Sequence, residues 1–181
     1  MDYNYYVLDV ESSRQVPVVF RAATSVDFDK TIFGHWQTNW HSGYLQDQRF
    51  DKYAMVVADS GELISLLACQ PDKRNRAAKL VYLESHPASN PTLVKGKRKK
   101  YHGIGKAFMA FAVDYSLSHG GDGSLYFKAK TTELYWHYIR DFGACPLRHG
   151  SFDLFLFASE AKLLQSDYTR KEDVQYGRQE L

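Results

Sequence analysis

Short hydrophobic runs separated by polar turns fill the middle of the chain. Residues 53–58 and 63–69 are two such runs, and Ser60 and Gly61 lie between them. Two β-prone runs around a short turn of this kind predict a β-hairpin. Further β-prone runs predict strands at 80–84, 124–129, 145–149 and 152–157, and either 5–10 or 18–20 could be a first strand.

A different periodicity follows residue 103. Apolar residues recur three and four apart from Ile104 to Tyr115, which predicts a helix over about 104–118. A second helix is predicted to begin at Thr131 or Thr132 and to end before Gly143. A strand, helix and strand in this order need a right-handed crossover. The sequence therefore predicts an α/β fold, with a mixed central sheet and helices on both of its faces.

The segments at either side of this pattern are less regular. Phe33, Trp36 and Trp40 are spaced by three and four residues, which predicts one face of a short helix between residues 25 and 51. Residues 159–181 are polar and charged, and only 161–164 favour a helix. We therefore expect one domain over residues 1–158 and a partly helical tail over 159–181.

Composition narrows the class of protein. The chain has 181 residues, of which 44% are hydrophobic and 24% are charged, as in an ordinary globular domain. Its net charge of +2 is too small to indicate a nucleic-acid binder. Cys69 and Cys145 lie in apolar contexts without metal or redox spacing, so we expect buried free thiols and no metal site. No apolar run is long enough to span a membrane and the N-terminus is acidic, which favours the cytoplasm.

The residues that open the helix at 104 carry the clearest chemistry. Gly103 and Gly105 let the backbone turn sharply and come close to a ligand. The first amides of a helix lack partners within it and attract anions, phosphates above all. Basic side chains crowd the same place, namely Lys95, Lys97, Arg98, Lys99, Lys100 and Lys106. The stretch predicts a phosphate cradle; the alternatives are a solvated basic loop or a nucleic-acid patch.

Two motifs resemble the GNAT superfamily of N-acetyltransferases. Lys100-x-x-Gly103-x-Gly105 is similar to the family's Arg/Gln-x-x-Gly-x-Gly/Ala signature, with Lys in the first position. Residues 134–144 resemble its late helix, which carries a tyrosine before Gly-Phe or Gly-Ala, with a spacer one residue longer here. The resemblance covers about residues 53–158. It implies a single-domain GNAT-type fold and an acyltransferase that uses acetyl-CoA, or a related acyl-CoA, as donor.

The resemblance also implies roles for particular residues. The cofactor's pyrophosphate would lie on the backbone amides from about Tyr101 to Lys106, and its pantetheine would hydrogen-bond along the strand that ends near Leu83 to Ser85. This cofactor set is Leu83, Ser85, Lys100, Tyr101, His102, Gly103, Ile104, Gly105 and Lys106. Glu84 would be the base, and Tyr138 would be the acid, with Tyr135 as its rival. His86 could relay the proton or could simply pack against the loop.

The acceptor is the least defined part. A primary amine, small molecule or peptide, would attack the thioester directly in a ternary complex. Trp36 and Trp40 could hold a cationic amine by cation–π contact, or they could only cover the sheet. The alternatives to an enzyme are a domain of this fold that binds CoA or a partner without turnover, and a nucleic-acid binder that uses residues 95–106. A homodimer through the apolar run 152–157 is compatible with the sequence.

Overall fold

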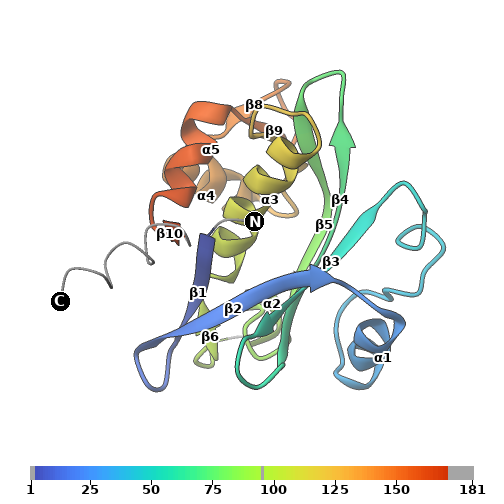
Figure 1. Cartoon of the computed structure of the whole chain (residues 1–181), viewed down its shortest axis with the longest axis vertical. Helices are drawn as coiled ribbons and strands as arrows, with labels where there is room; N and C mark the ends of the chain where they lie inside the picture. The colour runs from blue at the N-terminus through green and yellow to red at the C-terminus, as the bar shows by residue number, and fades with distance from the viewer. Residues whose placement is uncertain (1–2, 95, 171–181) are drawn as a thin grey trace, which may run out of the picture. The chain divides into compact units, whose positions relative to one another are not determined.

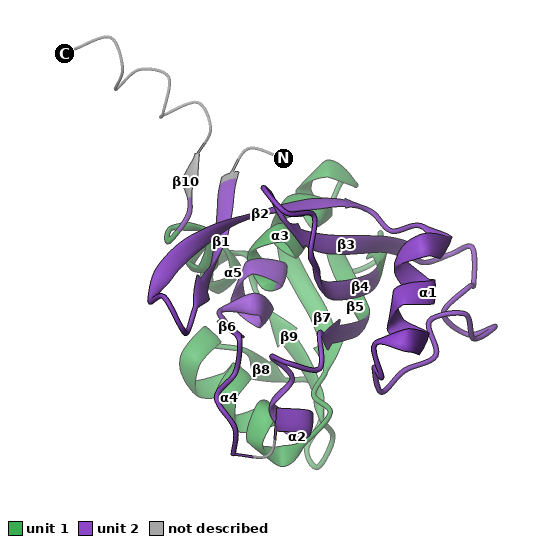
Figure 2. Ribbon diagram, turned by 90° about the horizontal axis from the view of Figure 1, so that it is seen from below, with its two compact units in different colours: residues 1, 69–81, 109–167 green, residues 2–68, 82–108, 168–181 purple. Residues whose placement is uncertain are grey.

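The computed structural model describes residues 3–94 and 96–170 (Figure 1). These residues form two units that interleave along the sequence. Unit 1 contains residues 69–81 and 109–167, and unit 2 contains residues up to 68, residues 82–108 and the chain from 168 (Figure 2). We describe each unit by itself.

Unit 2 is built on antiparallel strands. Strand β1 pairs with β2, and β2 pairs with β3; β1 also pairs with the short strands β6 and β10. The elements of this unit, whole or in part, are β1 (Tyr3–Asp9), β2 (Arg14–Ala22), α1 (Ser25–Phe33), β3 (Asp51–Val57), β4 (Leu63–Asp72), β5 (Ala77–Ser85), α2 (Pro91–Val94), β6 (Tyr101–His102) and β10 (Thr169–Arg170).

Unit 1 contains the rest of β4 and β5 and a mixed sheet. The strand order is β5-β7-β9-β8, with β5 parallel to β7 and the other pairs antiparallel. Leu125, Leu154 and Leu156 are fully buried, and the last helix packs against β7. Its other elements are α3 (Ile104–Ser118, from residue 109), β7 (Ser124–Lys128), α4 (Thr132–Phe142), β8 (Cys145–Pro146), β9 (Asp153–Leu156) and α5 (Ala158–Gln165).

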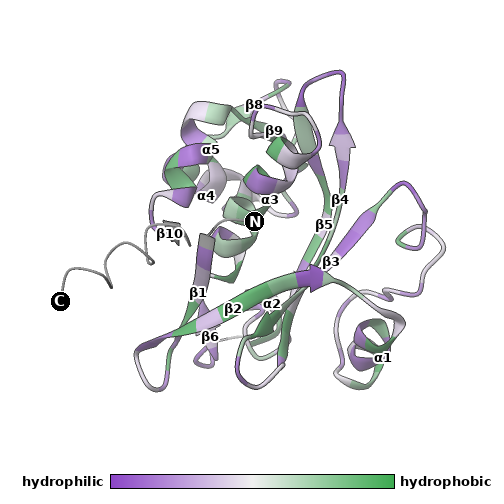
Figure 3. Cartoon of the chain, in the orientation of Figure 1, coloured by the Kyte–Doolittle hydropathy of each residue, from purple (hydrophilic) through white to green (hydrophobic). Residues whose placement is uncertain are grey.

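The most local predictions are confirmed. The hairpin is β3 and β4, and α3 spans the predicted residues. Helix α4 begins after Thr131, whose side chain accepts a hydrogen bond from the Leu134 amide at 3.3 Å. It ends at Gly143, which has a left-handed φ of 73°. Figure 3 shows the change from hydrophobic strand to hydrophilic turn at the β4–β5 hairpin.

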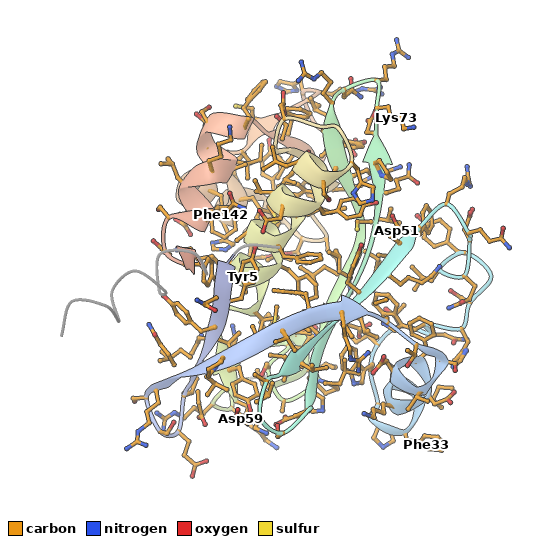
Figure 4. All side chains as sticks on the ribbon, viewed as in Figure 1. Tyr5, Phe33, Asp51, Asp59, Lys73 and Phe142 are labelled. Carbon is orange, nitrogen blue, oxygen red and sulfur yellow. The ribbon has the colours of Figure 1, made fainter. Side chains whose placement is uncertain are left out.

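The predicted helix face through Phe33, Trp36 and Trp40 is wrong. Helix α1 ends at Phe33, Gly34 caps it, and His35 follows with φ of 56°. A positive φ on a residue other than glycine breaks the helical path, so both tryptophans lie on a loop. Phe33 is 81% exposed and projects from the end of α1 (Figure 4).

Three smaller expectations also need correction or extension. Strand β4 runs on to Asp72, beyond the predicted end at residue 69. Cys145 is exposed rather than buried, whereas Cys69 is buried as expected, and neither is in a disulfide. Strand β6 was not predicted, because two residues carry no periodicity of their own.

The chain beyond residue 158 begins with α5, so the predicted helix exists and is longer than expected. Tyr168 is buried in unit 2, where its ring centroid lies 5.1 Å from that of Tyr5. Residues 171–181 of the predicted tail lie outside the described residues, and a domain boundary at 158 stays a prediction. Among the described helices none is long and apolar enough to cross a membrane. In the same part of the chain no cluster of three or more His, Cys, Asp or Glu side chains could hold a metal ion.

Candidate functional site

The N-terminus of α3 has the geometry of an anion site. Gly103 has φ of 86°, and its carbonyl accepts a hydrogen bond from the Ala107 amide at 2.9 Å. The amides of the first helical turn have no carbonyl within the helix to bond. A Cβ atom added to Gly103 or to Gly105 would meet no other atom within 4 Å. The backbone here therefore faces open space that a phosphate group could enter.

Residues 100–102, which we call the stem, lead into this turn and are already hydrogen-bonded within the protein. Tyr101 and His102 pair with Asp9 and Leu8 as β6. The Tyr101 amide donates to Ser89 Oγ at 3.0 Å, and the Lys100 amide donates to the Ala88 carbonyl at 2.8 Å. These two amides are therefore engaged within the protein. The predicted cradle included the Tyr101 amide, which is hydrogen-bonded within the protein. We therefore restrict the candidate phosphate site to the backbone of residues 103–106.

The Lys100 side chain is also engaged. Its ammonium lies 2.7 Å from both carboxylate oxygens of Glu62, and the Tyr101 hydroxyl donates to Glu62 Oε2 at 3.1 Å. The bond to Glu62 raises the pKa of Lys100. Lys100, which the sequence places among the basic side chains of the cradle, is therefore ion-paired with Glu62. Of the other basic side chains, Lys97 and Arg98 are exposed, Arg98 donates to the Val10 carbonyl, and Lys95 lies outside the described residues.

Leu83 and Ser85 lie at the end of β5, where no strand of the described residues pairs with the edge that faces away from β4. The Glu84 carbonyl accepts from Ser65 Oγ at 2.7 Å, and the His86 amide donates to the Ile64 carbonyl at 2.9 Å. Because backbone groups alternate along a strand, those of Leu83 and Ser85 point to the opposite edge. The parallel register of β5 with β7 ends at Leu80, before these residues.

Glu84 is buried, with 4% of its surface exposed, and both of its carboxylate oxygens accept hydrogen bonds. Oε1 accepts from the Gln37 amide at 2.6 Å, and Oε2 accepts from Trp40 Nε1 at 3.1 Å. The carboxylate thereby joins the end of β5 to the loop after α1. A second bond joins the same elements, between Thr38 Oγ1 and the Tyr82 hydroxyl at 2.5 Å.

The two tryptophans proposed for the acceptor differ in exposure. Trp40 is fully buried and stacks on Phe28 at 6.2 Å between centroids, as the alternative of a covering side chain expects. It offers no exposed face to an amine. Trp36 is half-buried and meets the His86 ring edge-on, with centroids 5.8 Å apart.

His86 keeps a defined tautomer. Its Nδ1 accepts a hydrogen bond from the Ala88 amide at 3.1 Å, which leaves the neutral ring's proton on Nε2. Burial lowers the pKa of His86. At neutral pH this ring is therefore a hydrogen-bond donor through Nε2, and its Nδ1 lone pair is already used.

Tyr138 and Tyr135 belong to α4 in unit 1. The Tyr138 ring packs edge-on against Phe127, with centroids 4.9 Å apart, and burial raises its pKa. Its hydroxyl donates to no group among the described residues. Tyr135 packs against Trp136 and Phe152, with centroids 5.2 and 5.5 Å apart. The Tyr138 phenol therefore keeps its proton at neutral pH.

Sequence reasoning missed Glu62 and Gln37. Glu62 lies in the turn of the β3–β4 hairpin, where an acidic residue is ordinary, and only the fold brings it to Lys100. Gln37 acts mainly through its backbone amide, which no side-chain pattern reveals. Its side-chain oxygen also accepts from Asn90 at 3.3 Å and Thr92 at 3.2 Å.

The chain is similar to known proteins in structure but not detectably in sequence. No family model matches the chain, and no curated protein matches it by sequence. A chimera of spermidine N-acetyltransferase SpeG from Vibrio cholerae with hSSAT is similar at a TM-score of 0.53 and 14% identity, over 80% of this chain and 98% of that one. AtaTR bound with AcCoA is similar at 0.52 and 14%, over 81% and 97%. A point mutant of KacT is similar at 0.51 and 15%, over 81% and 98%.

These likenesses cover nearly the whole of each known structure, but identity is low. They show the fold of this chain and do not identify its substrate or its functional residues. The chain has the GNAT acetyltransferase fold that its two motifs predicted.

Proposed function

We propose that the protein is an N-acetyltransferase that transfers an acetyl group from acetyl-CoA to a primary amine. The observation that carries the proposal is the N-terminus of α3, where Gly103 turns with positive φ and the space around Gly103 and Gly105 is open. This turn fits the diphosphate of CoA, because helix N-terminal amides bind phosphates. The open edge at Leu83 and Ser85 fits the amide groups of pantetheine.

Acetyl-CoA supplies an activated acetyl thioester. The amine nitrogen attacks the carbonyl carbon, a C–N bond forms, and the C–S bond breaks. An amine with a pKa of about 10.4 is almost entirely protonated at pH 7, so a base must remove a proton. In our proposal Glu84 accepts that proton, directly or through water, and Tyr138 donates one to the departing thiolate. Tyr135 is the alternative donor.

The acceptor would meet Trp36, which is half-buried, rather than Trp40, which is fully buried. An aromatic face favours a cationic amine. One of the similar structures is a spermidine N-acetyltransferase, so polyamines are the first amines to screen, followed by amino acids and peptide N-termini. Action in the cytoplasm and pairing of two copies through 152–157 stay predictions.

The test is thermal unfolding of the purified full chain with and without CoA and acetyl-CoA. A ligand at about 100 times its Kd should add about 2.7 kcal/mol and raise Tm by about 5–10 °C. A shift with both ligands supports the proposed cofactor and justifies the amine screen. No shift at millimolar concentration of either ligand would overturn the proposal.

A further inference from the structure

The carboxylate of Glu62 is the side-chain anchor of the stem that leads into α3. It contacts the Lys100 ammonium through both oxygens at 2.7 Å and accepts from the Tyr101 hydroxyl at 3.1 Å. Lys100 also lies over the Tyr101 ring, 5.1 Å from its centroid. Tyr101 is only 6% exposed, whereas the side chains of Glu62 and Lys100 are 31% and 45% exposed.

The stem is held from a second direction by its backbone. The amides of Lys100 and Tyr101 bond to Ala88 and Ser89, and Tyr101 and His102 pair with β1. These contacts fix the path of the chain, and Glu62 fixes the side chains two and three residues before Gly103. The hairpin turn of β3 and β4 thereby contacts the stem, which leads into the turn that would receive the phosphates.

We propose that Glu62 is a positioning residue for the phosphate site at the N-terminus of α3. It acts through Lys100 and Tyr101, and it does not itself touch the anion. The inference rests on the proposed function, because it assumes that CoA binds at this turn.

Loss of the Glu62 charge would have two opposite effects on the affinity for CoA. Removing the Glu62 charge frees the Lys100 ammonium, which by electrostatics alone would strengthen binding of a phosphate. Removing the charge also loosens the stem. The ligand must then order the stem when it binds, which lowers the free energy gained on binding. The exposed basic residues Lys97 and Arg98 already precede the stem in the sequence, whereas the stem has one carboxylate contact in the described residues. We therefore expect the loss of order to dominate and CoA binding to weaken.

The experiment is titration calorimetry of CoA into the full chain, with Glu62→Gln and Glu62→Asp compared with Asp59→Asn. Asp59 lies in the same hairpin turn and is exposed, so it controls for the loss of one charge there (Figure 4). We expect about tenfold weaker binding for Glu62→Gln. Glu62→Asp keeps the charge but shortens the side chain, and we expect it to weaken binding as well. Asp59→Asn should bind within twofold of the wild type.

A second readout needs no ligand. Hydrogen exchange at the amides of residues 103–106 should be faster in Glu62→Gln than in Asp59→Asn, because the stem is less ordered. Unchanged exchange together with equal or tighter CoA binding in Glu62→Gln would overturn the role of Glu62. Failure of the wild-type chain to bind CoA would instead overturn the proposed function, so the two failures are distinguishable.

Discussion

Trp40 donates its indole N–H to Glu84 Oε2 at 3.1 Å, and both side chains are buried. The bond joins a loop without regular structure to the end of β5. A hydrogen bond between a neutral donor and a buried carboxylate is among the stronger kinds in proteins. The pair therefore sets the direction of the carboxylate that we propose as the base.

Trp40→Phe should destabilise the protein by about 1–3 kcal/mol. The phenyl ring can still stack on Phe28, but a buried carboxylate oxygen loses its donor. Urea unfolding of this variant and of Trp36→Phe makes the comparison, because Trp36 is half-buried and meets His86 only by its ring. Equal losses in the two variants would contradict a special role for the Trp40 bond.

Gly105→Asp should abolish much of the CoA binding without unfolding the protein. The position has open space and lacks a positive φ, and an acidic residue in the first turn of a helix is stabilising. The new carboxylate would repel a phosphate and weaken CoA binding at least about tenfold. Gly105→Asn is the matched neutral control, and calorimetry should find it within about threefold of the wild type. If Asp and Asn bind CoA equally well, phosphates do not lie at this turn.

Tyr138→Phe should lower kcat by about 100-fold or more while CoA affinity stays within twofold. The hydroxyl donates to no described group, so the free energy of unfolding should change by less than about 0.5 kcal/mol. Because burial raises the pKa of Tyr138, the alkaline fall in kcat of the wild type should lie above pH 10. Tyr135→Phe is the control. A larger loss of kcat in that variant would make Tyr135 the acid.

Asp27 should make the protein sensitive to acid. Burial alone would raise its pKa, but hydrogen bonds from Arg21 and Thr24 lower it from 3.8 to about 2. The group therefore stabilises the fold fully above about pH 4, and the stabilisation is lost as the pH falls toward 2. The shift corresponds to roughly 2 kcal/mol.

Urea unfolding of Asp27→Asn between pH 2 and 7 tests this assignment. The variant should lose about 2 kcal/mol at pH 7 and approach the wild type near pH 2. Asp29→Asn, on the exposed side of α1, should differ from the wild type by less than about 1 kcal/mol. A loss in Asp27→Asn that is independent of pH would contradict the shifted pKa.

Local signals account for what could be predicted. The turn at Gly61, the cap at Thr131 and the apolar face of α3 are each encoded within a few residues, and the structure has the elements they predict. The cradle motif also lies within one stretch. In contrast, the bonds of Glu84 to Trp40 and of Glu62 to Lys100 join residues 44 and 38 positions apart. Such pairs follow from the path of the whole chain, so no spacing rule finds them.

The end of α1 shows a further limit of pattern reasoning. The spacing of Phe33, Trp36 and Trp40 is helical, but Gly34 and the positive φ of His35 divide it. Phe33 is the last residue of the helix and is itself 81% exposed, so the three rings share no buried helix face. Beyond the helix, the two rings serve different partners, Trp36 with His86 and Trp40 with Glu84.

The interleaving of the two units constrains how the protein can be dissected. Unit 1 is made of 69–81 and 109–167, and residues 82–108 between them belong to unit 2. Any continuous fragment that holds all of unit 1 therefore carries the stem, Glu84 and the start of α3 with it. Neither unit can be released by a single cleavage of the chain or expressed as one continuous fragment without part of the other. Point substitutions in the full chain are therefore the means of separating what each unit contributes to stability and ligand binding.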